Sequence, residues 1–134
     1  ESFRQRFQQE VVTIARLEHP HILPVYDSGE FEGMPYLVMR YLPTGSLQDL
    51  MTERSLSMSE IDSLFTQLAR ALAYAHGQGV VHRDIKPANI LVNERNDIFL
   101  TDFGIAKLIE STAQITASGS ITGTPSYMSP EQAQ

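Results

Sequence analysis

The sequence predicts a fold that contains both helices and strands, because two kinds of apolar periodicity alternate along one short chain. Residues 3–17 and 57–76 place apolar side chains at the spacing of an amphipathic helix. Short runs rich in β-branched and aromatic residues, such as 90–92 and 98–100, stand between polar loops and are typical of strands. The 134 residues are enough for one modest domain and too few for two.

The amino-terminal third predicts a helix followed by a hairpin. Within 3–17, polar residues separate Phe3, Phe7, Val11, Ile14 and Leu17. Two strand-like runs follow, Ile22–Tyr26 and Tyr36–Tyr41. The turn-forming residues Ser28-Gly29-Glu30 and Gly33 lie between them, so we expect the two runs to pair as a hairpin.

The middle of the chain predicts two helices. Pro43–Ser46 is a turn sequence, and Leu47–Met51 is expected to form a short helix after it. Ser57 followed by Glu60 is a capping box that opens a longer helix, which Gly77 and Gly79 end. The apolar stripe of this helix is interpreted as core: Ile61, Leu64, Phe65, Leu68, Leu72 and Ala75. Beyond it, Val80-Val81, Ile90–Val92 and Ile98–Leu100 are short β-type runs.

Composition and charge exclude several classes of function. Ten basic residues stand against sixteen acidic ones, for a net charge of −6 without a basic cluster, which argues against nucleic acid as a partner. The absence of cysteine excludes disulfides and thiolate metal sites. No apolar run approaches the roughly 20 residues of a membrane span, and the first residues do not form a signal peptide. A cytoplasmic location is the simplest expectation.

Four motifs that are rich in polar residues follow one another along the chain. A polar loop reads His82-Arg83-Asp84-Ile85-Lys86-Pro87-Ala88-Asn89, and Asp102-Phe103-Gly104 follows thirteen residues after its end. Ser129-Pro130-Glu131 stands further along, and Glu10 lies in the first predicted helix. In this order the sequence resembles the protein kinase family, whose catalytic loop, metal-binding triplet, Ala-Pro-Glu motif and ion-pairing helix glutamate these segments match. The resemblance implies a two-lobe α+β fold with the helical lobe larger.

The resemblance assigns catalytic roles to the polar loop and the triplet. Asp84 would accept or orient the proton of the substrate hydroxyl, and Lys86 would place a positive charge on the transferring phosphate. Asn89 and Asp102 would supply oxygen ligands to the Mg²⁺ that accompanies ATP. A lysine two residues after the catalytic aspartate is similar to Ser/Thr kinases rather than tyrosine kinases, so the substrates would be protein Ser/Thr hydroxyls.

The resemblance also predicts the nucleotide pocket. Met39 would be the gatekeeper, the backbone carbonyl of Arg40 and the amide of Leu42 would hydrogen-bond adenine, and Leu91 would form the apolar floor. Glu10 would normally pair with the lysine that holds the α- and β-phosphates. Four more residues resemble the stacked column that links the two lobes of a kinase: Ile14, Tyr26, His82 and Phe103.

Regulation is expected in the activation segment, 102–131, which is rich in hydroxyl side chains. Arg83 would pair with a phosphorylated residue of this segment. Thr116 and Ser118 fall where bacterial relatives carry activating phosphates, and autophosphorylation in trans is a possible source of them. Thr124 resembles the residue that contacts Lys86 and Asp84.

The expected domain is partial. Residues 1–39 would belong to the small lobe, 40–46 to the hinge, and 47–134 to the first part of the large lobe. Only nine residues precede Glu10 and none is a lysine, so the glycine-rich loop and strand lysine of the family are missing. We therefore expect this segment alone to be inactive. A membrane anchor of the complete protein would lie outside it.

Two alternatives remain open at the level of sequence. One is a truncated, non-catalytic binding or regulatory module similar to a pseudokinase, although such a module has no chemical need for Asp84, Lys86, Asn89 and Asp102. The other is a small-molecule phosphotransferase. The segment 123–131, which is similar to the protein-substrate docking loop of kinases, argues against it.

Overall fold

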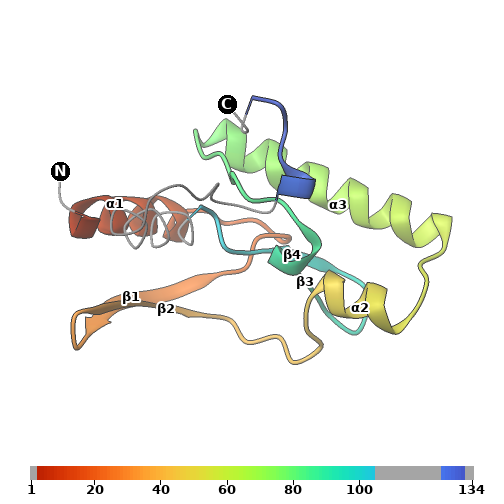
Figure 1. Cartoon of the computed structure of the whole chain (residues 1–134), viewed down its shortest axis with the longest axis horizontal. Coiled ribbons are helices and arrows are strands. Elements are labelled where there is room, and N and C mark those ends of the chain that lie inside the picture. Colours follow the sequence, from red (N-terminus) through yellow and green to blue (C-terminus); the bar gives the residue numbers. More distant parts are fainter. Residues whose placement is uncertain (1–2, 105–124, 132–134) are drawn as a thin grey trace.

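The computed structural model describes residues 3–104 and 125–131 (Figure 1). Its elements, in chain order, are helix α1 (Phe3–Ala15), strands β1 (Val25–Phe31) and β2 (Met34–Met39), helices α2 (Leu47–Glu53) and α3 (Met58–Gly77), the 3₁₀ turn η1 (Pro87–Asn89), strands β3 (Ile90–Val92) and β4 (Ile98–Leu100), and the 3₁₀ turn η2 (Pro125–Tyr127). Two small antiparallel sheets, β1-β2 and β3-β4, lie among these helices.

The hairpin is confirmed, but its boundaries differ from the prediction. β1 pairs with β2 from Val25↔Met39 to Phe31↔Met34, so Ser28-Gly29-Glu30 lies within a strand. The turn consists of Glu32 and Gly33, both with positive φ (49° and 80°), which is the backbone of a two-residue hairpin turn that matches the strand twist. The run 22–24 lies outside the hairpin.

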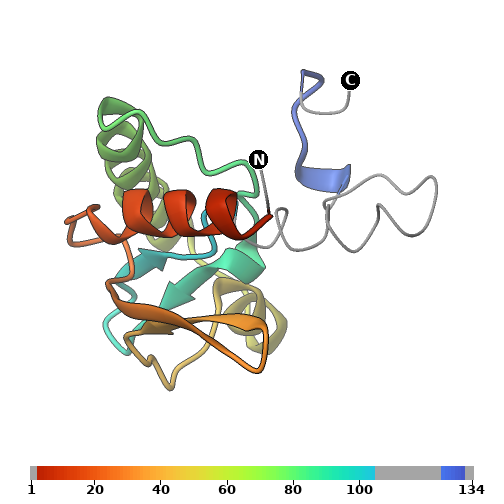
Figure 2. The same cartoon turned by 90° about the vertical axis from the view of Figure 1, so that its left-hand side faces the viewer.

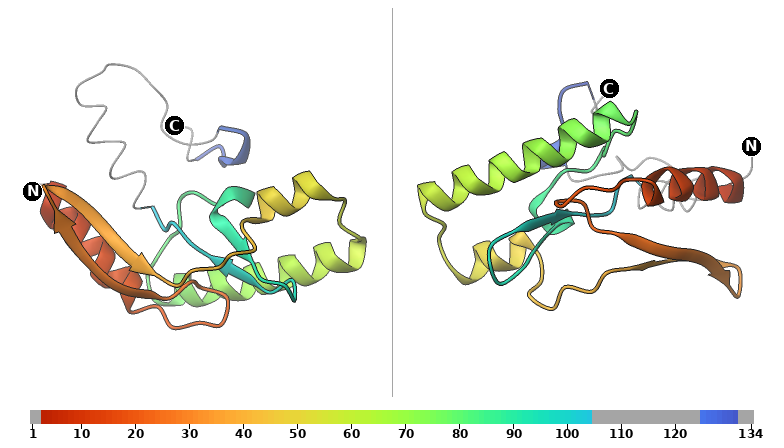
Figure 3. Two further views of the ribbon diagram at one scale, coloured as in Figure 1. Left: turned by 90° about the horizontal axis from the view of Figure 1, so that it is seen from below. Right: turned by 180° about the vertical axis from the view of Figure 1, so that it is seen from behind.

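Helix α1 has the predicted amphipathic character and packs against β1. Phe7, Val11 and Ile14 are buried on one face, while Val12 on the opposite face is 51% exposed. The helix ends at Ala15, and a final turn, in which the Leu17 amide donates to the Ile14 carbonyl (3.0 Å), keeps Leu17 in the core. Figure 3 shows α1 lying along the hairpin.

Helix α3 begins and ends where its sequence signals predict. The Ser57 hydroxyl accepts from the Glu60 amide, and the Glu60 carboxylate accepts from the Ser57 amide, which completes the capping box. Gly79, just beyond the helix, has φ +77°, a conformation that glycine adopts without steric cost. Leu64 and Ala75 of the predicted stripe are buried, but Phe65 is 67% exposed.

The β3-β4 pair lies at the centre of the molecule and is as predicted, residue for residue. All three residues of β4 are buried, and Leu100 has no exposed surface. α3 packs against β4 and α2 packs against β3. Figure 2 shows the two strands between α3 above and α2 below, with α1 and the β1-β2 hairpin nearer the viewer. This strand pair therefore ends where the polar loop 82–89 and the 102–104 triplet meet.

The strand expected at Val80-Val81 is absent. Val80 is buried in the core, whereas Val81 is 61% exposed, and the two residues follow the turn at Gly79 without joining either sheet. Among residues 3–104 and 125–131, none of the helices has both the length and the apolar character that a bilayer span needs.

The hydrogen bonds of the Glu60 carboxylate make the stability of the fold depend on pH. The carboxylate accepts from Arg54 (2.7 and 3.1 Å) and from the Ser57 amide (2.8 Å), and these bonds lower the pKa of Glu60 from 4.5 to about 2. A lowered folded-state pKa adds stability above pH 4.5, and that stability is lost as the pH falls toward 2. We expect urea denaturation of the complete protein to show wild type more stable than Glu60→Gln at pH 6. The difference should narrow below pH 4.5; a difference independent of pH would contradict this account.

Candidate active site

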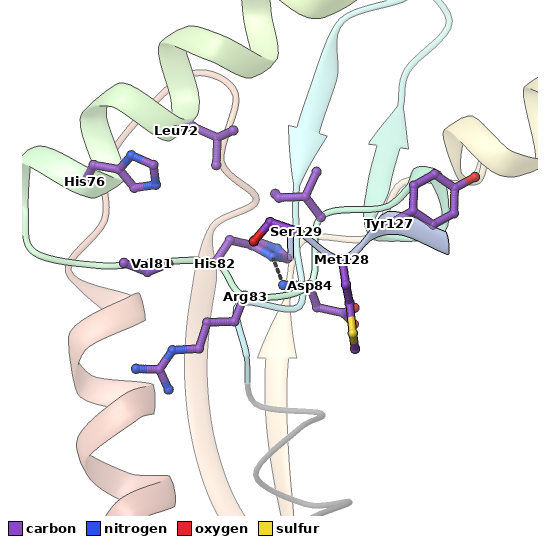
Figure 4. Close-up of a pocket in the computed structure, with 10 residues that line it drawn as sticks. Leu72, His76, Val81, His82, Arg83, Asp84, Tyr127, Met128 and Ser129 are labelled. Carbon is purple, nitrogen blue, oxygen red and sulfur yellow. Dashed lines mark hydrogen bonds between the residues drawn. The ribbon is translucent and has the colours of Figure 1, made fainter. Parts of the chain in front are cut away.

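His82 fixes the start of the polar loop. Its Nε2 lies 2.7 Å from the carbonyl oxygen of Thr101, so Nε2 carries the proton, and Nδ1 accepts from the backbone amide of Asp84 at 3.1 Å (Figure 4). The ring packs on Phe103 with centroids 4.6 Å apart and is almost completely buried. His82 therefore packs against Phe103, as expected of two members of the stacked column, and its hydrogen bond also fixes the backbone of Asp84.

Asp84, Asn89 and Lys86 converge within the loop. Nδ2 of Asn89 donates to the Asp84 carboxylate (3.1 Å) and to its backbone carbonyl (2.9 Å). Nζ of Lys86 lies 3.7 Å from the same carboxylate oxygen, Oδ2. The side chains of Asp84 and Lys86 keep 14% and 26% of their surface exposed, so an incoming group can reach them. Asn89 is the last residue of η1, and its two bonds to Asp84 join the end of the loop to its middle.

Asp102 lies next to this group. Partial desolvation and the negative charge of Asp84 raise the pKa of Asp102, and Lys86 offsets this only in part. The residue as a whole is exposed, yet the protein around its carboxyl group is sufficient to raise the pKa. Two carboxylates that repel each other in this way attract a divalent cation. Because both contacts of Asn89 with Asp84 use Nδ2, Oδ1 of that amide is the atom suited to such a cation.

Two residues of the site have left-handed backbone conformations. Arg83 has φ +73° and Asp102 has φ +59°. Such values are uncommon outside glycine and cost free energy, so they persist where the surrounding contacts impose them. The conformation at position 83 lets Arg83 and Asp84 point in different directions (Figure 4).

Arg83 lines a cavity of about 570 Å³ beside the loop. The cavity lies between the end of α3, the polar loop and the segment 127–129, and Figure 4 shows Leu72 and His76 on its α3 side. Tyr127, Met128 and Ser129 close the opposite side. The Ser129 motif is therefore brought next to the loop, although the two are more than forty residues apart in sequence.

The loop 82–89, the triplet 102–104 and the segment 127–129 lie close together, and comparison with known proteins identifies the family of the chain. The family model of the protein kinase domain matches residues 1–134. The chain belongs to the protein kinase family. The curated relatives described below are bacterial serine/threonine kinases, and the mixed helix and strand structure corresponds to part of the kinase fold.

Two curated kinases and one solved kinase domain illustrate the similarity. The "Probable serine/threonine-protein kinase pknA2" of Bifidobacterium longum is 42% identical over 132 residues, 98% of this chain and 17% of that protein. PknB of Mycobacterium leprae is 38% identical over 138 residues, 99% of this chain and 22% of that protein. The crystal structure of the Mycobacterium tuberculosis PknI kinase domain has a TM-score of 0.70 and 42% identity, covering 77% of this chain and 43% of that one. The chain thus spans 17% to 22% of the length of these curated kinases.

Of the residues expected to form the nucleotide pocket, Met39, Arg40 and Leu91 are linked to the β3-β4 pair and to Thr101. Met39 ends β2, and its sulfur accepts a hydrogen bond from the Thr101 hydroxyl at 3.8 Å. Thr101 immediately precedes Asp102 in the sequence. Arg40 stacks over Phe99 at 5.4 Å from the ring centroid, and Phe99 is the strand partner of Leu91. Leu42 is half-buried in the segment that leads to α2. Glu10 lies half-buried in α1.

The stacked column of the kinase fold needs one correction. Ile14, His82 and Phe103 are buried, and the two rings touch, but Tyr26 is 65% exposed. The neighbouring Val25 packs against the core instead. The pairing of β1 with β2 is irregular between Val25 and Asp27, so the bulge turns Tyr26 to the outer face. Tyr26 was therefore the wrong choice.

Three expected residues lie outside the described part of the chain. Thr116, Ser118 and Thr124 fall within 105–124, so their positions stay predictions. Conversely, Thr101 links the loop to Met39, a connection that the sequence did not predict. Its carbonyl binds His82, its amide donates to the Asn89 carbonyl (3.0 Å), and its hydroxyl binds Met39. A small polar residue directly before the triplet was the signal available.

Proposed function

We propose that the complete protein transfers the γ-phosphoryl group of ATP to Ser/Thr hydroxyls of protein substrates. The observation that carries the proposal is the convergence of Lys86 and Asn89 on the carboxylate of Asp84, which is also close enough to Asp102 to help desolvation raise the pKa of Asp102. Phosphoryl transfer needs this kind of arrangement, because catalysis depends mainly on positioning and on stabilising charge.

The residues of the site have separate roles in the phosphoryl transfer. Asp84 orients the substrate hydroxyl and takes up its proton, and the Asn89 amide and the buried His82 hold Asp84 in place. Lys86 supplies positive charge to the phosphoryl oxygens as they pass from ATP to the hydroxyl. Bound Mg²⁺ would neutralise phosphate charge there, and Asn89 and Asp102 are the residues that would hold it.

ATP would lie beside β2 and the segment after it. Met39 would bound the pocket, the backbone of Arg40 and Leu42 would bind adenine, and Leu91 would pack beneath the base. Glu10 would contribute from α1. These placements follow the family pattern, and the proximity of Met39 to Thr101 supports them.

Domain organisation and regulation complete the proposal. Residues 1–39 form part of the small lobe, 40–46 the hinge, and 47–134 the first part of the large lobe, with the activation segment at 102–131. Phosphorylation at Thr116 and Ser118, by another copy of the enzyme, would order that segment through Arg83, and Thr124 would contact Lys86 and Asp84. The chemistry fits a catalytic domain in the cytoplasm, where ATP is abundant.

Phosphoamino-acid analysis tests the proposal. The complete protein, incubated with Mg²⁺, [γ-³²P]ATP and the generic substrate myelin basic protein, should yield phosphoserine and phosphothreonine but no phosphotyrosine. The control is the Lys86→Met variant, which keeps the length of the side chain but loses its charge and should lower labelling by about 100-fold or more.

Two outcomes would reject the proposal. Phosphotyrosine as the main product would reject the Ser/Thr assignment. An inability of the complete wild-type protein to label itself or any protein, together with intact ATP binding, would favour the non-catalytic regulatory module.

A further inference from the structure

The outer edge of strand β4 is completed by groups from two other parts of the chain. In an antiparallel pair, every second residue turns its amide and carbonyl away from its partner strand. The bonds from Asn93 to Asp97 and from Thr101 to Asn89 show that Ile98 and Leu100 are the residues of β4 that face outward. Both are buried, so their backbone groups need protein partners.

The segment 21–23 supplies hydrogen-bond partners for most of these backbone groups. The amide of Leu100 donates to the carbonyl of His21 (2.8 Å), and the amide of Leu23 donates to the carbonyl of Leu100 (2.9 Å). Nδ1 of His21 donates to the carbonyl of Ile98 at 3.0 Å, because a carbonyl oxygen can only accept. One outward group of β4 then remains, the amide of Ile98.

Gln67 of α3 binds that last group. Its Oε1 accepts from the Ile98 amide at 2.9 Å. Its Nε2 donates to the Ser63 hydroxyl at 3.2 Å and lies 3.5 Å from the carbonyl of Asn96, so the amide is held in the orientation that presents Oε1 to the strand. Gln67 is half-buried between α3 and the β3-β4 turn.

From Ile98 to Asp102 the chain has little freedom. Ile98 is bound by Gln67 and His21, Leu100 by the segment 21–23, and Thr101 by Asn89 and His82. A shift at Ile98 therefore passes along three consecutive buried residues to Asp102, whose left-handed backbone depends on its surroundings.

We propose that Gln67 is a positioning residue for Asp102. It acts through Ile98 and has no contact with substrate or nucleotide. The inference rests on the proposed function, since it concerns the residue assigned there to the metal ion. Neither the helical periodicity of α3 nor the phosphoryl-transfer motifs single Gln67 out.

Two variants of the complete protein separate positioning from bulk stability. Gln67→Leu removes the acceptor and leaves the Ile98 amide without its partner, whereas Gln67→Glu keeps an acceptor oxygen at that point. The probe is Mn²⁺ in the presence of the non-hydrolysable ATP analogue AMP-PNP, with free Mn²⁺ measured by electron paramagnetic resonance. We expect Gln67→Leu to weaken Mn²⁺ binding about tenfold. Gln67→Glu should recover most of the loss.

A matched control uses Ile61 on the same helix. Ile61→Ala truncates a half-buried side chain that lines the apolar cavity next to α2, away from β4. It should lower the Tm as much as Gln67→Leu or more, yet leave Mn²⁺ affinity unchanged at temperatures where the protein is folded. If Gln67→Leu does not fold, Gln67→Asn takes its place in the comparison with Ile61→Ala. Asparagine is one methylene shorter, so its amide is withdrawn from Ile98.

The outcomes are distinct. Mn²⁺ affinity equal to wild type in the folded Gln67 variant overturns the positioning role, whatever happens to the Tm. Equal weakening by Ile61→Ala overturns it as well, because the effect would then follow stability alone. A wild type that binds no Mn²⁺ with AMP-PNP overturns the proposed function, and this inference falls with it.

Discussion

Replacing Asp84 by asparagine in the complete protein is expected to lower kcat by about 10²- to 10⁴-fold, the range that loss of a general acid–base group costs. The amide has the shape of the carboxylate, and its oxygen can still accept from Nδ2 of Asn89, so the loop should keep its conformation. It cannot take up the proton of the substrate hydroxyl. The affinity for ATP should therefore change little, and a direct nucleotide-binding measurement beside the steady-state assay checks both expectations.

Asp97→Asn is the matched control for Asp84→Asn. Asp97 also accepts a side-chain hydrogen bond from an asparagine, with Nδ2 of Asn93 at 3.0 Å, but it stands in the turn between β3 and β4. The same chemical change there should leave kcat near the wild-type value. Turnover by Asp84→Asn close to that of wild type would remove Asp84 from its assigned role.

Asp102→Asn is expected to have the second large effect, a loss of at least about 100-fold in the apparent affinity for Mg²⁺. Asparagine tolerates the left-handed backbone at this position, so the fold should survive the change. The variant loses the anionic oxygens that a hard cation prefers. Titrating Mg²⁺ at saturating ATP and measuring both kcat and the apparent KM for the ion would show the loss.

The loss of Mg²⁺ affinity in Asp102→Asn should not be accompanied by a loss of folding stability. The pKa of Asp102 is raised in the folded state, so its stabilising contribution is complete below pH 3.8 and is lost as the pH rises through the raised value. At neutral pH the ionised carboxylate therefore works against the fold. Asp102→Asn without nucleotide or metal should have a Tm at or above that of wild type. A lowered Tm together with unchanged Mg²⁺ dependence would contradict the assignment.

Local sequence signals predicted the elements that depend on local contacts. The capping box of Ser57 and Glu60 placed the start of α3 because the two residues satisfy each other's backbone. The runs 90–92 and 98–100 were recognisable as strands because polar residues bound each of them. The loop 82–89 could be interpreted because its residues, in order with the 102–104 triplet, match the catalytic loop of the protein kinase family.

Local sequence signals failed where contacts between residues far apart in the sequence determine the structure. Ser28-Gly29-Glu30 has the composition of a turn, yet pairing with 35–37 keeps it in β1. The pairing of β1 with β2 is irregular after Val25, so Val25 faces the core and Tyr26, which was expected there, faces outward. The partners of Ile98 come from residues 31 and 77 positions away in the sequence, so no local pattern reports them.

The central claim is that Asp84, Asn89 and Asp102 surround one metal–triphosphate group. Crystals of the complete kinase domain grown with AMP-PNP and Mn²⁺ would test it through the anomalous scattering of manganese. We predict a manganese peak coordinated directly by the side-chain oxygens of Asn89 and Asp102, with Asp84 facing the γ-phosphate. A manganese ion bound to the nucleotide but held by other residues, with these three side chains directed to separate surfaces, would contradict the account.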